Sequence, residues 1–328
     1  MSAVHLQGAP DASGDAPIIR EYPPLPGALE AISAAAMRGS LRAFFKSVMK
    51  PPAPVQLQRG ILHMLSVLMP PALGVKVEKI RVGQMSAERL TPKGLAQPKH
   101  AMLYLHGGAF CAGSPRSHRS ITSRLAKFAQ CEVLAIHYRR VPEHPFPAQI
   151  EDAVAGYKHL LQKGYRPEHI AVGGDSAGGT LTLLVTKALE LEGIEGPRCL
   201  VMMSPAFDAK LDSQSVKRNK QLDPMINIEW GHQGFAWYRP RHDHPLAFPK
   251  RQNLSTLPPT LVQVGEHEVL YDDSVWLAHA CKRFDRELEL EIYLKRWHVF
   301  QIHAGLMPSA TLALQRQAEF MKKQWAKA

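Results

Sequence analysis

Short apolar runs alternate with amphipathic stretches along most of this chain, from about Val75 to the C-terminus. Runs such as AMLYL, VLAI and LVMM are typical of strands that are buried on both faces of a sheet. We predict strands at residues 77–82, 88–92, 101–105, 132–137, 169–173, 199–203, 260–264 and 288–294.

The stretches between these runs carry apolar residues at spacings of three and four, which is the period of an amphipathic helix. We predict helices at residues 121–129, 149–163, 178–191, 272–284 and 309–325. Alternating strands and helices favour an α/β fold, here an eight-stranded, mostly parallel sheet flanked by helices.

Two regions interrupt this alternation. Residues 28–70 carry two apolar stripes, and residues 208–255 are rich in Pro, His, Lys and Asp, with one helical pattern at 228–237. We interpret residues 28–74 as N-terminal cap helices and 208–255 as a second cap segment within a catalytic domain at 75–328. Plain packing onto the core and a helix lying on a membrane surface are the other interpretations of the stripes.

The start of the chain, residues 1–27, is rich in Pro, Gly, Ala and Asp, which predicts a poorly ordered leader. It lacks the charged and apolar regions of a signal peptide, and the chain contains no apolar run long enough for a transmembrane helix. No CxxC pair occurs among the four cysteines, so free thiols and a cytoplasmic location are expected.

The formal net charge of +11 raises the question of nucleic-acid binding. Lysine and arginine are spread along the chain, however, and the densest cluster, at residues 217–220, is short. No zinc-finger, helix-turn-helix or RNP pattern accompanies it, so we expect no nucleic-acid partner.

The chemistry centres on Ser176, in the sequence Gly-Asp-Ser-Ala-Gly at residues 174–178. A strand pattern precedes this motif and a helix pattern follows it, which is the context of a nucleophile elbow. Glycines at 174 and 178 suit the tight turn, because a side chain there would collide with the neighbouring strand and helix. The helix N-terminus places positive partial charge beneath a developing anion.

A second motif, His-Gly-Gly-Ala-Phe at residues 106–110, directly follows the strand AMLYL. Acyl transfer passes through a tetrahedral oxyanion, which backbone N–H groups without bulky side chains can approach closely. We expect the N–H groups of Gly107, Gly108 and Ala177 to form the oxyanion hole.

The serine needs a general base and an acid that orients it, in the chain order Ser, Asp or Glu, His. His298 directly follows a late strand and is the predicted base, with His303 as the second candidate. After the strand TLVQVG we favour Glu268 as the acid, with Asp272 as the fallback.

Together, HGGAF, YRRVPEHPFPAQIED (138–152), GDSAGG and WHVF resemble motifs of the hormone-sensitive-lipase-like family of α/β hydrolases. The resemblance covers the chain from about residue 75 to the end and implies the α/β-hydrolase fold, a two-part helical cap and esterase activity on short acyl chains. One departure concerns the acid, because Glu268 stands where the family usually has aspartate.

We therefore expect a serine carboxylesterase that uses the triad Ser176, His298 and Glu268, needs no cofactor or metal, and acts on a small ester. The same serine chemistry leaves an amidase, lactonase or peptidase as alternatives. A binding module without catalysis is disfavoured because His298 is present, and His232, His242 and His244 match no zinc spacing. The sequence leaves open whether the protein forms a homodimer.

Overall fold

Nine strands form one sheet in the computed structural model, which describes residues 18–49 and 51–328. Their spatial order is β1-β9-β8-β7-β6-β4-β5-β3-β2, and all neighbouring pairs are parallel except β2–β3 and β3–β5. In chain order the strands are β1 (Ile18–Tyr22), β2 (Val75–Val82), β3 (Met85–Pro92), β4 (Ala101–Leu105), β5 (Glu132–Ile136), β6 (Ile170–Asp175), β7 (Cys199–Met203), β8 (Thr260–Gly265) and β9 (Leu288–Tyr293).

All eight predicted strands are present, and the ninth, β1, lies inside the segment expected to be a poorly ordered leader. Residues 1–17 of that segment lie outside the described residues. β1 pairs in parallel with the edge strand β9, and Arg20 Nη1 lies 2.5 Å from Glu289 Oε2. Four of its five side chains are exposed, so the burial pattern that reveals the other strands is missing here.

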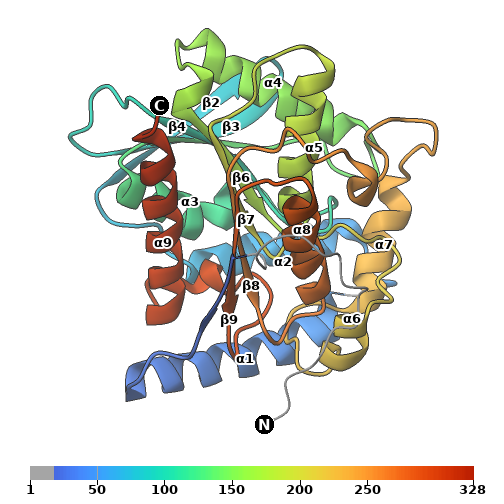
Figure 1. Cartoon of the computed structure of the whole chain (residues 1–328). Helices are drawn as coiled ribbons and strands as arrows, with labels where there is room; N and C mark the ends of the chain where they lie inside the picture. The colour runs from blue at the N-terminus through green and yellow to red at the C-terminus, as the bar shows by residue number, and fades with distance from the viewer. Residues whose placement is uncertain (1–17, 50) are drawn as a thin grey trace.

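Helices cover both faces of the sheet, as the alternating pattern predicts (Figure 1). One face packs against α3 (Arg119–Ala129) and α9 (Pro308–Trp325), and the other against α4 (Ala148–Gln162), α5 (Ala177–Leu191) and α8 (Tyr271–Arg283). Single-turn 3₁₀ helices occur at η2 (Arg116–His118), η3 (Pro167–His169), η4 (Pro249–Arg251) and η5 (Phe300–His303).

The two regions that interrupt the alternation lie together beyond the carboxyl ends of the central strands (Figure 1). They contain α1 (Ala28–Val48), α2 (Val55–Leu65), η1 (Ser66–Leu68), α6 (Gln214–Asn219) and α7 (Ile228–Tyr238), which we call the cap. Trp230 Nε1 of α7 donates to Gln58 Oε1 of α2 at 2.8 Å, and Lys46 Nζ of α1 donates to Ile226 O at 2.6 Å. These bonds join the two parts of the cap to each other.

Two further expectations concern the environment of the chain. All four cysteines are buried and free. No helix in the described part of the chain is long and apolar enough to cross a bilayer.

Candidate active site

Ser176 lies at the sharp turn between β6 and α5, where the sequence predicts the nucleophile. Its backbone has φ 54° and ψ −120°, a strained conformation for a residue with a side chain, and its N–H donates to Met203 O at 2.8 Å. A Cβ atom on Gly174 or Gly178 would lie 2.2 or 1.9 Å from Leu105 O. Only glycine therefore fits on either side of this turn.

His298 and Glu268 form a buried, hydrogen-bonded pair. His298 Nδ1 lies 2.8 Å from Glu268 Oε2, and Glu268 Oε1 accepts the N–H of Gly265 at 2.7 Å. The carboxylate can only accept, so the proton of the neutral imidazole is held on Nδ1 and the lone pair is left on Nε2. This is the tautomer that a general base for serine requires.

Burial and charge act in opposite directions on this pair. Burial disfavours the charged form of His298, but the hydrogen bond and charge of Glu268 outweigh it and raise the pKa of the imidazole above 6.5. Burial likewise raises the pKa of Glu268, whereas the two donated hydrogen bonds favour its ionised form. The pair is built to stabilise an imidazolium ion.

The pair is positioned by loops at the carboxyl ends of adjacent parallel strands. Glu268 follows β8, and His298 follows β9. Val299, next to the imidazole, has φ 48° and donates its N–H to Ser204 Oγ at 3.1 Å, and Ser204 itself follows β7. Neighbouring strands therefore bring together residues that lie far apart in the sequence.

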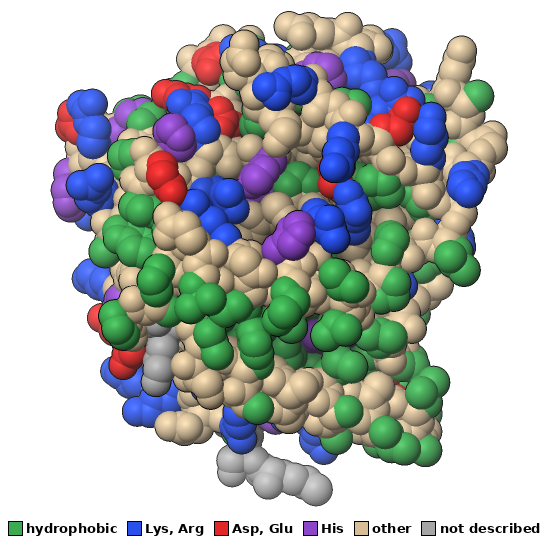
Figure 2. Space-filling model, turned by 180° about the vertical axis from the view of Figure 1, so that it is seen from behind, with side chains coloured by type: hydrophobic (Ala, Val, Ile, Leu, Met, Phe, Trp, Pro, Cys, Tyr) green, Lys and Arg blue, Asp and Glu red, His purple; other side chains and the backbone are tan. Residues whose placement is uncertain are grey.

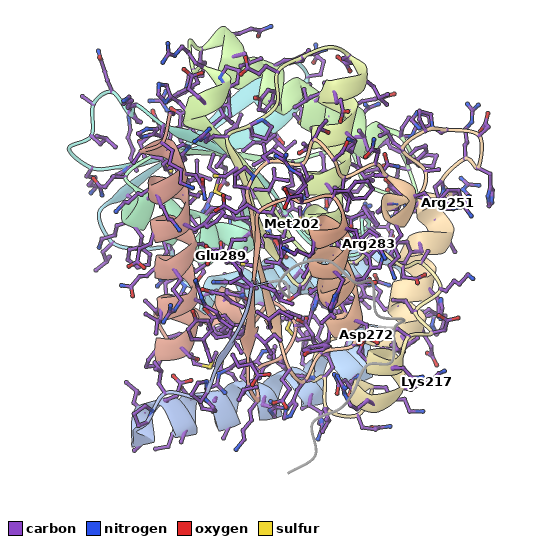
Figure 3. All side chains as sticks on the ribbon, in the orientation of Figure 1. Met202, Lys217, Arg251, Asp272, Arg283 and Glu289 are labelled. Carbon is purple, nitrogen blue, oxygen red and sulfur yellow. The ribbon has the colours of Figure 1, made fainter. Side chains whose placement is uncertain are left out.

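Asp272, the fallback acid, points elsewhere. It lies in the first turn of α8, and its Oδ2 accepts the backbone N–H of Ser215 in α6 at 2.7 Å. In Figure 3 the labelled residues Asp272 of α8 and Lys217 of α6 lie in the same lower right part of the molecule. Its geometry is that of a residue joining α8 to the cap, and it makes no hydrogen bond to His298 in the described structure.

The expected oxyanion hole needs one correction. The N–H of Gly107 already donates to Asp175 Oδ1 at 3.1 Å, so it is not free for an oxyanion. Within the described residues the N–H groups of Gly108 and Ala177 have no acceptor, and neither has that of Ala109. Gly108 also lines the cavity that contains Ser176.

A second histidine–carboxylate pair, which we did not predict, lies beside the nucleophile. Asp175 is fully buried and accepts three hydrogen bonds: from Tyr104 Oη at 2.6 Å, from His118 Nε2 at 3.2 Å and from the N–H of Gly107. Burial alone would lower the pKa of His118, but Asp175 raises it. The sequence places Asp175 directly before the serine, but nothing in the sequence indicates that Asp175 pairs with His118.

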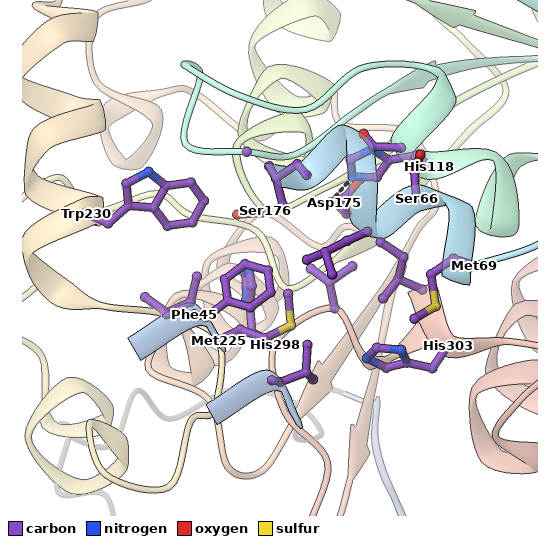
Figure 4. A pocket seen from close by; sticks show the side chains of 18 residues that line it. Phe45, Ser66, Met69, His118, Asp175, Ser176, Met225, Trp230, His298 and His303 are labelled. Atoms are coloured by element: carbon purple, nitrogen blue, oxygen red, sulfur yellow. Dashed lines mark hydrogen bonds and ion pairs between the residues drawn. The ribbon is translucent and has the colours of Figure 1, made fainter. Parts of the chain in front are cut away.

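The cavity around Ser176 has a volume of about 730 Å³, part of which is open to solvent, and is predominantly apolar (Figure 4). Trp230, Phe45 and Met225 lie on one side of the serine, and Met69, Ser66 and His118 lie on the other. Both the cap and the sheet contribute to its walls.

Ser176 and His298 both line this cavity, although they share no hydrogen bond in the described structure. Contacts of this kind are often long in a free enzyme and shorten when substrate binds. His303 lines the cavity as well, but its ring nitrogens have no hydrogen-bond partner, so no acid orients it.

Among the described residues, the other histidines form no metal site. His242 contacts Phe248, and His244 contacts Phe146, on the cap side of the molecule. The described residues contain no group of three or more side chains that could hold a metal ion.

Comparisons with known proteins show what this chain is similar to. A model of the alpha/beta hydrolase fold family matches residues 102–302. An acetyl-hydrolase from Streptomyces hygroscopicus is 36% identical over 247 residues, which cover 74% of this chain and 81% of that protein. An esterase from Acinetobacter venetianus is 32% identical over 285 residues, 85% of this chain and 93% of that protein.

Solved structures give the same result. An esterase from the bacterial hormone-sensitive lipase family superposes with a TM-score of 0.83 at 35% identity, covering 92% of this chain and 99% of its own. An esterase/lipase from an uncultured bacterium gives a TM-score of 0.82 at 34% identity, with 90% and 99% covered. The similarity therefore extends over the cap as well as the sheet.

Proposed function

Because this chain belongs to the alpha/beta hydrolase family and is a carboxylic ester hydrolase, we propose that it cleaves short-chain acyl esters through an acyl-enzyme on Ser176. The observation that carries this proposal is the hydrogen bond between His298 Nδ1 and Glu268, in the cavity that also contains Ser176. It supplies a base, in the correct tautomer, within one site.

The mechanism follows from these positions. Ser176 Oγ attacks the ester carbonyl while His298 Nε2 takes its proton, and Glu268 stabilises the imidazolium that forms. The tetrahedral intermediate collapses, the C–O bond to the alcohol breaks, and His298 returns the proton to the leaving oxygen. Water then attacks the acyl-enzyme by the same sequence and releases the acid.

We assign the oxyanion hole to the N–H groups of Gly108 and Ala177, with Ala109 as a third donor. Their support is that no acceptor occupies them among the described residues, whereas Gly107 is already bonded. Asp175 acts as a positioning residue, because it fixes Gly107 and thereby the neighbouring Gly108 relative to the serine that follows it. Each oxyanion donor typically contributes about 3–4 kcal/mol to the barrier reduction.

The preference for short acyl chains rests on the apolar cavity and on relatives. Trp230 and Phe45 are bulky side chains on one side of the serine. One relative is named an acetyl-hydrolase, another, from Pseudomonas putida, an ethyl acetate hydrolase, and a solved structure was soaked with p-nitrophenyl butyrate. These names support a substrate of two to about six acyl carbons.

A panel of p-nitrophenyl esters and matched anilides tests the proposal. We expect kcat/KM to be highest for short acyl esters and far lower for the anilides. Ser176→Ala should lose about 10⁶ of kcat, and a fluorophosphonate should label Ser176 in the unmodified protein. Faster cleavage of anilides than of esters would contradict ester hydrolysis as the main activity, and a maximum of kcat/KM at long acyl chains would contradict the short-chain preference. A fluorophosphonate adduct on another serine would contradict Ser176 as the nucleophile.

A further inference from the structure

The outer face of α2 and η1 exposes large apolar side chains. Nine of the thirteen exposed large hydrophobic residues in the described structure lie before Val75. We use the name apolar rim for five of them, whose exposed fractions are 50, 60, 67, 63 and 88%: Leu57, Met64, Val67, Leu68 and Leu73. Figure 2 shows hydrophobic side chains gathered in a band on this side of the molecule.

The apolar rim adjoins the active-site cavity. Leu57, Met64 and Leu68 follow one another at spacings of seven and four residues, so they share one face of the helix. The opposite face of the same segment supplies Leu62 and Met69 to the cavity wall. A surface helix normally has one polar face, so an outer face this apolar indicates a contact partner.

The charges around the apolar rim are positive. Between Pro23 and Val77 the sequence contains a single acidic residue, Glu30, and it is buried in an ion pair with Arg296. Lys127 lies at the rim itself, because its Nζ donates to Leu73 O at 3.1 Å. Arg116 is exposed on η2, which packs against α2. One part-exposed carboxylate lies beside this segment, Glu143, and it is paired with Arg59 of α2 at 2.7 Å. An apolar surface bordered by the cations Lys127 and Arg116 complements an anionic lipid surface.

We propose that the apolar rim docks on the surface of an anionic phospholipid bilayer and thereby brings the α2 wall of the active-site cavity against the lipid. The side chains insert among the acyl chains near the headgroups, while Lys127 and Arg116 contact lipid phosphates. No part of the chain crosses the bilayer in this arrangement. The inference concerns binding, so it stands apart from the ester chemistry proposed above.

A second copy of this chain is a poorer occupant. Symmetric association through the apolar rim would place the same cationic border of two molecules side by side, and each molecule carries a formal charge of +11. An anionic lipid surface attracts the cationic border of the apolar rim, so docking on lipid involves no such repulsion.

Vesicle flotation tests the proposal on the full-length protein. We expect binding to vesicles of phosphatidylcholine mixed with phosphatidylglycerol, weaker binding at high salt, and little binding to phosphatidylcholine alone. Leu68→Asp should weaken binding to the anionic vesicles by about tenfold or more, because it puts a charge where the surface enters the lipid. Lys127→Gln should weaken it by about fivefold, since each basic residue near such a surface contributes separately.

The matched control is Leu191→Asp, because Leu191 is also a leucine and is 62% exposed, but lies at the end of α5. It should bind anionic vesicles as the unmodified protein does. Hydrolysis of a soluble, monomeric p-nitrophenyl ester should be unchanged in Leu68→Asp and Leu191→Asp, which shows that both variants fold. Absence of binding to anionic vesicles would overturn the proposal, and so would an equal loss of vesicle binding in Leu68→Asp and Leu191→Asp. A third contrary result is a protein that binds no vesicles but forms a dimer in light scattering, which Leu68→Asp dissociates.

Discussion

The role of Glu268 can be tested by replacing it with glutamine, which keeps the shape of the side chain and removes the charge. Both carboxylate oxygens accept hydrogen bonds, one from His298 and one from the N–H of Gly265. An amide has only one oxygen. If that oxygen stays on Gly265, the NH₂ group faces His298 Nδ1 and forces the proton onto Nε2.

In that tautomer the imidazole has no lone pair directed at Ser176 and cannot accept its proton. With the amide flipped, two N–H groups face each other at Gly265 inside a fully buried site, which is also unfavourable. We therefore expect kcat to fall by about 10²–10⁴, which corresponds to about 3–5 kcal/mol of barrier. The acid limb of the pH profile should move to lower pH, because the charge that raises the pKa of His298 is gone.

The assay is kcat for a short p-nitrophenyl ester at saturation, with circular dichroism to verify folding. Asp272→Asn is the matched control, because its remaining side-chain oxygen can still accept the N–H of Ser215, so kcat should change by less than about threefold. Glu268→Asp should retain part of the activity if the loop after β8 can shift toward His298. A crippled Asp272→Asn together with a nearly silent Glu268→Gln would refute the assignment.

Three further predictions concern the same site. Activity should fall as pH drops through the pKa of His298, which Glu268 raises above 6.5 against the effect of burial, so a pH profile of kcat/KM should show its acid limb above that value. Asp175→Asn should lower the free energy of unfolding by about 1–3 kcal/mol in urea titrations and also lower kcat, whereas Asp243→Asn, in an exposed pair, should do neither. Overnight dialysis against EDTA should leave activity unchanged, because the base that we propose for Ser176 is His298 and not a metal-bound hydroxide; inactivation that added zinc reverses would contradict this.

Most of the fold could be predicted because buried parallel strands leave a strong signal in the sequence. β4, β5 and β7 are five-residue strands in which every side chain is buried, so their composition alone marks them. β1 has the opposite character, since it lies at the sheet edge with exposed side chains and is stabilised by pairing with β9. A strand of that kind is specified by its partner and leaves little local pattern.

The candidate site also contains some features that the sequence predicts and others that it does not. Ser176 could be found because the strand, the glycines and the helix that make its turn are consecutive in the sequence. Two of the proposed oxyanion donors, Gly108 and Ala177, were also predicted, but the full set could not be, because whether an N–H is free depends on a distant acceptor. Gly107 and Gly108 are equivalent in sequence, and only the position of Asp175 distinguishes them.

The two histidine–carboxylate pairs beside Ser176 have the same chemical groups, yet their surroundings allow only one to act as a base. His118 has partners at both ring nitrogens: Asp175 Oδ2 lies 3.2 Å from Nε2, and Ser117 Oγ and Ser114 O lie 2.9 and 3.2 Å from Nδ1. The carboxylate of Asp175 can only accept, so Nε2 carries a proton and offers no lone pair to Ser176, and Nδ1 is occupied by its own partners.

His298 has one such acceptor, Glu268 on Nδ1, and in the described structure its Nε2 has no partner. The imidazole can therefore be neutral before it takes the serine proton and is stabilised afterwards. The hydrogen-bond partners around each ring, which no sequence motif encodes, support His298 as the proposed base and leave His118 as the group that holds Asp175 in place.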